Sequence, residues 1–155
     1  MFEENKAVVQ RWLDMVQGNQ EEVWDSYLTM NEDMTWTLIG KTLISGTHKG
    51  LKAINDDFFA KCWSGDGRGG GTQGLDQEYG VKLDIQQVVA LEDGRIMVIC
   101  LSDGKGRNGV PYRNQYCWII SVRDGKMSEL IEYCDTAMIE EAMFDKKIVP
   151  AEQLG

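Results

Sequence analysis

The chain has 155 residues, of which 43% are hydrophobic, and its formal net charge is −9. This composition predicts one folded domain, and the negative charge argues against nucleic acid or an anionic membrane as the main partner. The longest apolar run, residues 96–101, is too short to span a bilayer, and the first residues lack a signal-peptide pattern, which predicts a cytoplasmic protein.

Helices are predicted in the first part of the chain. Residues 3–17 carry an apolar stripe at helical spacing. Asn19 followed by Glu22 is the pattern of a capping box, which predicts a second helix to about residue 28. Residues 50–62 predict a third helix, because apolar side chains again recur at helical spacing.

Strands are expected before and after this third helix. Residues 34–39 alternate as a strand, and residues 43–48 are expected to return beside it. A second hairpin is predicted around Asp93-Gly94, joining residues 81–91 to residues 95–102. In the predicted register its pairs are Val89 with Val98, Gln87 with Cys100, Val88 with Ile99 and Ala90 with Met97.

A glycine-rich loop separates the helices from the second hairpin. Residues 64–80 contain seven glycines, which predicts a flexible loop rather than a domain boundary. We expect it to act as a mobile lid with Trp63 as its fixed end, and with Arg68 placed to meet an acidic ligand. The segment Gly65–Gly70 fits a dinucleotide-binding pattern only through its abundance of glycine, since it follows a helix rather than a strand.

The final hairpin gives the strongest local signal. Residues 112–134 flank Asp124-Gly125, a dipeptide typical of a two-residue type I′ turn. A regular register then places one set of side chains on a single, mostly aromatic face, because strand side chains alternate. The predicted pairs on this face are Asn114 with Asp135, Tyr116 with Tyr133 and Trp118 with Ile131. A helix is predicted to start at Thr136.

Helices early and strands late predict an α+β fold, with helices against one face of a curved antiparallel sheet. The other face of the sheet is also expected to be apolar. A monomer would expose this patch, which predicts a homodimer that buries it. The residues predicted on this outer face are Val88, Ile99, Cys117, Ile119 and Leu130.

Four segments together resemble a known group. They read VVQRWLDMV, MTWTLIG, ISGTHKGLKAI and YRNQYCWIISVRDGKMSELIEYCDTAMIEEAMF. The chain resembles the SnoaL-like polyketide cyclase group of the ketosteroid isomerase-like (nuclear transport factor 2-like) superfamily. The resemblance implies a single domain over residues 1–155, with 64–80 as a loop insertion. It also implies a cone-shaped α+β barrel with a deep pocket between sheet and helices, and a homodimer made through the outer face of the sheet.

The resemblance argues against the best-known reaction of this superfamily. The positions of the ketosteroid isomerase tyrosine, general base and second acid fall at or near Trp12, Leu38 and Trp118. Leucine cannot move a proton, and tryptophan offers only an N–H donor. The essential aspartate of the similar limonene-epoxide hydrolases maps to Asp135, whereas their partner arginine and second aspartate fall near Ile99 and Leu101.

Asp135 is therefore the predicted acid or base. A carboxylate on an aromatic face is costly to keep charged, which suits proton transfer. Asn114 is expected to hold it or to bind a substrate carbonyl, and Tyr116 to donate to a developing oxyanion. The alternative is that Asp135 is an ordinary N-cap for the helix that follows. The residues predicted to contact substrate are Trp12, Trp36, Leu38, Phe58, Trp63, Trp118 and Tyr133.

Metal and nucleophilic sites have little support. Cys62, Cys100, Cys117 and Cys134 show no Cys-x-x-Cys spacing, and His48 is the only histidine, on an expected surface strand end. The cysteines are predicted to be buried or half-buried thiols, and neither metal nor cofactor is expected.

Two functions remain open. One is a cofactor-free enzyme that performs acid/base chemistry on a small hydrophobic, carbonyl-bearing molecule. The other is a ligand-binding or interaction module of the same fold, without chemistry.

Overall fold

The computed structural model describes residues 2–65 and 73–155. The three predicted helical regions form, although the third contains a π-helical stretch, η2, between α3 and α4. The elements are α1 (Phe2–Val16), α2 (Gln20–Asp25), η1 (Ser26–Thr29), β1 (Met30–Leu38), β2 (Gly46–Lys49), α3 (Leu51–Ala53), η2 (Ile54–Phe59), α4 (Ala60–Ser64), β3 (Lys82–Ala90), β4 (Ile96–Lys105), β5 (Pro111–Tyr112), β6 (Gln115–Arg123), β7 (Lys126–Cys134), α5 (Thr136–Phe144) and η3 (Ala151–Gln153).

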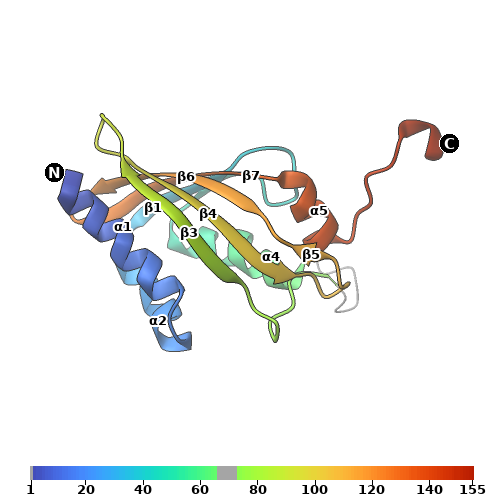
Figure 1. The fold of residues 1–155 in the computed structure, drawn as a ribbon, viewed down its shortest axis with the longest axis horizontal. Coiled ribbons are helices and arrows are strands. Elements are labelled where there is room, and N and C mark those ends of the chain that lie inside the picture. The colour runs from blue at the N-terminus through green and yellow to red at the C-terminus, as the bar shows by residue number, and fades with distance from the viewer. Residues whose placement is uncertain (1, 66–72) are drawn as a thin grey trace.

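One curved sheet organises the molecule. Its strand order is β2-β1-β7-β6-β4-β3, and β5 pairs with β4. The sheet was predicted to be antiparallel but is mixed, because β1 pairs with β7 in parallel. Figure 1 shows α1 and α2 toward one end of the sheet and α5 at the other, with the C-terminal segment extending beyond α5. No described helix is long and apolar enough to cross a membrane, and the expected cytoplasmic location stays a prediction.

The core lies between the helices and one face of the sheet, which we call the inner face. Helix α1 contacts β3, β4, β6 and β7, and it buries Val9, Trp12 and Leu13. Complete burial of such side chains contributes about 1.5–3 kcal/mol each to folding. The fully or nearly fully buried residues of the inner face are Met34, Trp36, Leu38, Ile96, Val98, Cys100, Ser102, Tyr116, Trp118, Ile120, Leu130 and Glu132.

A β-bulge in β7 changes the predicted register of the final hairpin. The predicted turn forms, with positive φ at both Asp124 and Gly125. Val122 pairs with Met127 as predicted, but Ser121 pairs with Glu129, so Ser128 is an extra residue. Every later side chain of β7 therefore points to the face opposite to the one predicted. Trp118 lies opposite Glu132 rather than Ile131, and Cys117 lies opposite Tyr133.

The β3–β4 hairpin is also shifted from the predicted register. Val88 pairs with Val98 and Val89 with Met97, and a second irregularity lies between Ile85 and Gln87. The predicted outer-face positions of Val88 and Leu130 are therefore wrong, since Leu130 is fully buried in the core and Val88 packs against it. The register places the following on the outer face: Val89, Met97, Ile99, Leu101, Cys117, Ile119, Ile131 and Tyr133.

The predicted lid is described only at its ends. Arg68 and the glycines at 67 and 69–71 lie outside the described residues. The later part of the segment is anchored, because Leu75 is buried and its N–H donates to the Cys62 carbonyl over 2.8 Å.

Candidate functional site

The interior that was predicted to form a deep pocket is filled by aromatic rings in the described part of the chain. Trp12 lies edge-on to Trp36 and to Trp118, with ring centroids 6.1 and 5.3 Å apart. Phe58 lies 5.4 Å from Trp36 on the other side. These side chains are at most 4% exposed, so they form a packed core and not an open cavity.

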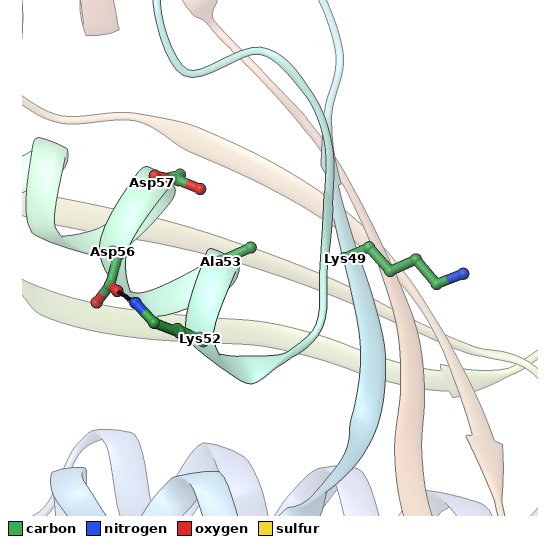
Figure 2. Close-up of a pocket in the computed structure, with 5 residues that line it drawn as sticks. All are labelled: Lys49, Lys52, Ala53, Asp56 and Asp57. Carbon is green, nitrogen blue, oxygen red and sulfur yellow. Dashed lines mark hydrogen bonds and ion pairs between the residues drawn. The ribbon is translucent and has the colours of Figure 1, made fainter.

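Two hollows lie on the surface instead. Figure 2 shows the first, of about 330 Å³, where the Lys52 ammonium is paired with the Asp56 carboxylate. Lys49 extends away from the helical segment that carries the other four lining residues. The first hollow is lined by Lys49, Lys52, Ala53, Asp56 and Asp57; the second, of about 340 Å³, is lined by Trp24, Tyr27, Leu51, Lys52 and Asn55.

Glu132 is the most unusual group of the inner face. Its side chain is on β7, past the bulge, and the residue is only 6% exposed. Trp118 Nε1 donates to Glu132 Oε1 over 2.9 Å, which is the one side-chain hydrogen bond that described residues make to it. Burial raises the pKa of Glu132 from 4.5 to about 7, and the hydrogen bond from Trp118 opposes this only in part. No described cation forms an ion pair with it.

Three thiols lie close enough to this carboxyl group for its charge to raise their pKa values. Burial, and then the charge of Glu132, raises the pKa of Cys100 to about 12 and raises the pKa values of Cys62 and Cys134 further. All four cysteines are free, and these three stay protonated at neutral pH, which makes them poor nucleophiles and poor metal ligands. Among the described residues, no three His, Cys, Asp or Glu side chains converge as metal ligands.

Hydroxyl groups form a buried network beside the thiols. The Tyr116 hydroxyl donates to the Tyr112 hydroxyl over 2.8 Å and lies 3.4 Å from Ser102 Oγ. Asn114 Nδ2 is 3.3 Å from the Tyr112 hydroxyl. Burial, with the charge of Glu132 as a further cause, raises the pKa values of both tyrosines well above the usual value. Both phenols are therefore neutral donors at physiological pH.

Asp135 does not lie inside, and its predicted placement is wrong. Its side chain is exposed and accepts hydrogen bonds from Ala137 N and Met138 N, at 3.1 and 3.3 Å. The alternative interpretation, an N-cap, describes this geometry. Asn114 does meet Asp135 as predicted, but through the main chain: Nδ2 donates to Asp135 O over 3.0 Å, and Asp135 N donates to Oδ1 over 2.9 Å.

Of the other predicted site residues, most lie in the interior. Trp12, Trp36, Leu38, Phe58, Trp118 and Tyr116 are buried. Trp63 is half-buried at the end of α4. Tyr133 is 47% exposed, so its predicted inward position is wrong, because the bulge reverses the face. The His48 Nε2 is bonded to the Ile44 carbonyl at 2.7 Å.

Comparison with known proteins identifies the fold. No protein-family model and no curated protein sequence matches the chain. Bal32a, from a soil-derived mobile gene cassette, is 23% identical, covers 90% of this chain and 96% of its own, and superimposes with a TM-score of 0.68. An NTF2-like protein from Burkholderia xenovorans LB400 is 20% identical, with 91% and 96% covered and a TM-score of 0.62.

The chain has the NTF2-like fold. A protein described as a SnoaL-like polyketide cyclase, from Jannaschia sp. CCS1, is 14% identical, with 94% of each chain covered and a TM-score of 0.67. The resemblance expected from the sequence is thus confirmed at the level of the fold. Because the NTF2-like fold hosts unrelated activities, function has to be argued from the site.

Proposed function

We propose that this protein is a cofactor-free enzyme in which Glu132 moves a proton on a small hydrophobic, carbonyl-bearing molecule. The observation that carries the proposal is a carboxyl group buried on the inner face, held by one indole N–H and paired with no described cation. Such a group changes protonation near neutral pH, which is the property that a general acid or base needs. It takes the role first expected of Asp135.

The neighbouring phenols supply the second part of the mechanism. When a base removes a proton next to a carbonyl group, negative charge develops on the carbonyl oxygen. Tyr112 and Tyr116 are buried neutral donors, and a hydrogen bond to that oxygen stabilises the charge in a region that excludes water. Trp118 Nε1 keeps the carboxyl group of Glu132 in a fixed orientation.

Proton exchange tests this proposal without knowledge of the natural substrate. The protein is incubated in D₂O with a panel of cyclic and aryl ketones, and loss of the α-proton signal is followed by ¹H NMR. We expect accelerated exchange that rises as pH passes through about 7 and Glu132 loses its proton. Glu132→Gln should abolish it. Glu129→Gln, on the same strand, is the matched control and should accelerate ketone α-proton exchange as much as the wild type does. Equal rates with the wild type and Glu132→Gln would overturn the proposal.

A second candidate function is a non-catalytic binding or interaction module. The aromatic interior favours it, because the rings of Trp12, Trp36 and Trp118 are buried and packed against one another. On this alternative, no ketone in the panel exchanges faster than in buffer, with or without Glu132.

We further propose that two copies pair through the outer face. Met97, Ile119 and Ile131 lie side by side across β4, β6 and β7, and Tyr133 beside them is 47% exposed. A contiguous apolar surface of this kind is typical of an isologous interface. Sedimentation equilibrium should give a dimer, and a monomer at micromolar concentration would contradict the proposal.

A further inference from the structure

The indole N–H of Trp36 has no hydrogen-bond partner. Trp36 is 2% exposed, and its Nε1 is one of two buried side-chain polar atoms left unpaired among the described residues. The other is Oε1 of Glu140, whose second carboxylate oxygen is paired with Lys146. Buried polar groups are nearly always bonded, so an orphaned donor in a core needs an explanation.

No oxygen of the described residues accepts a hydrogen bond from this N–H. Its ring lies 6.1 Å from Trp12, 5.4 Å from Phe58 and 4.9 Å from Phe59. These neighbours contribute carbon-rich rings and no carbonyl or carboxylate group. A neutral oxygen brought in by another molecule would complete the hydrogen bond, whereas an anion would be penalised by desolvation in such a setting.

The helical segment that carries the two phenylalanines is unusual as well. Ile54–Phe59 is π-helical, although the residues before and after it are α-helical. Single π-helical turns are rare and frequently occur at functional sites. Consecutive residues of this turn, Phe58 and Phe59, both contact Trp36, and they lie edge-on to each other at 5.0 Å. Phe58 is buried, whereas Phe59 is only half-buried and so is the solvent-side member of the pair.

We propose that Trp36 Nε1 is the binding point for an uncharged oxygen of a small apolar ligand, and that Phe59 covers this point in the free protein. The ligand's carbonyl, ether or hydroxyl oxygen accepts from the indole, and the ring of Phe59 moves aside to admit it. Trp12 contacts both Trp36 and Trp118, and Trp118 donates a hydrogen bond to Glu132. The site thus deepens the proposed function, since it names the group by which a substrate is held at a distance from the proton-transferring carboxyl group.

A matched pair of probes isolates the hydrogen bond. Acetophenone and α-methylstyrene have similar shapes, but only the first carries an acceptor oxygen. In ¹H–¹⁵N spectra of the five indole groups, assigned by single Trp→Phe variants, acetophenone should move the Trp36 signal downfield and α-methylstyrene should not. Trp36→Phe should weaken acetophenone binding about fivefold, the typical value of one hydrogen bond, and leave α-methylstyrene binding unchanged.

Control variants separate this site from the rest of the interior. Trp12→Phe removes a different buried indole of the same cluster and should leave the preference for acetophenone intact. Trp36→Phe should retain a cooperative unfolding transition, because the N–H that it removes has no hydrogen-bond partner to lose. Phe59→Ala should tighten acetophenone binding several-fold, because the ring that competes for the space is gone. Weaker binding to Phe59→Ala would contradict the covering role.

The outcome is independent of proton transfer. In Glu132→Gln, acetophenone should still bind and still move the Trp36 signal, because the anchoring hydrogen bond does not involve Glu132. Equal affinity of the wild type for the two probes, or acetophenone binding that leaves the Trp36 signal unmoved, would overturn the inference and leave the proposed role of Glu132 standing.

Discussion

The two faces of the sheet come from the same strands but differ in how they are covered. Helices and aromatic rings close the inner face within one chain, and the carboxyl group buried there has a pKa of about 7. On the outer face the apolar side chains of β3, β4, β6 and β7 adjoin one another, and Tyr133 stays 47% exposed. The comparison teaches that alternation along the same strands can leave one face covered within the chain and the other face exposed.

The largest expected effect comes from deleting Ser128, the extra residue whose bulge determines which side chains of β7 face the core. Deleting Ser128 removes the bulge, so Ile131 and Tyr133 would turn inward and Glu132 outward. We expect a loss of about 5 kcal/mol of unfolding free energy, or no cooperative transition at all, in urea denaturation. Ser128→Ala keeps the backbone and should cost less than about 1 kcal/mol. A deletion variant as stable as the wild type would show that the bulge does not set the faces.

The buried carboxyl group makes stability depend on pH. The folded-state pKa of Glu132 is raised from 4.5 to about 7, so the folded state holds a proton that the unfolded chain releases between these values. The stability that this proton contributes is complete below pH 4.5 and is lost as pH rises to about 7. The unfolding free energy should fall by about 3 kcal/mol over this range. Glu132→Gln stays neutral and keeps an acceptor for Trp118.

Urea unfolding between pH 4 and 8 measures this effect. The unfolding free energy of Glu132→Gln should not fall as pH rises, so the variant should be more stable than the wild type at pH 8. At pH 4 the two proteins should have nearly the same unfolding free energy. Matching pH profiles in wild type and variant would show that Glu132 is not buried as described.

A charge on the outer face should break assembly and spare the fold. Ile119→Lys places an ammonium group between Met97 and Ile131, within the apolar surface that the proposed dimer would bury. We expect dimer affinity to fall roughly 100-fold, or about 3 kcal/mol, in sedimentation experiments. Gln115→Lys, at the exposed edge of the same face, is the control and should leave the dimer intact. An unchanged dimer affinity of Ile119→Lys would show that the chains pair through another surface.

The smallest effect belongs to the residue first expected to be catalytic. Asp135→Ala removes the acceptor for two main-chain N–H groups of α5 and should cost about 1 kcal/mol of stability. Thermal unfolding measures that cost. Ketone α-proton exchange should be unchanged, because the Asp135 side chain is exposed. Asp135→Asn retains a capping oxygen and should recover most of the lost stability.

The fold was predictable because its signals are local. The stripe that makes α1, the Asp124-Gly125 turn and the start of α5 at Thr136 each depend on neighbouring residues, and each forms. The parallel pairing of β1 with β7 was missed, because no local pattern reveals which distant strand becomes a neighbour.

The site was misassigned for a single physical reason. Alternation predicts the face of each β7 side chain only while the strand is regular, and one inserted residue reverses every side chain after it. A signal for this exists in the sequence. Met127 and Leu130 are both fully buried but three residues apart, a spacing that a regular strand cannot place on one face. The two apolar residues that flank Ser128-Glu129 therefore indicate a bulge. A bulge there predicts that Glu132 points to the inner face.

The parallel pairing of β1 with β7 also governs when the protein can fold. β1 lies between β2 and β7, so its only neighbour apart from the short β2 is a strand that follows β3 to β6 in the chain. Closing so long a loop is entropically costly and slow, and it delays the contacts that bury Trp36. During synthesis the N-terminal helices and the first hairpin emerge early and must wait, with their apolar side chains unprotected. We therefore expect β1 to pair with β7, and the sheet to be completed, only after β7 has left the ribosome.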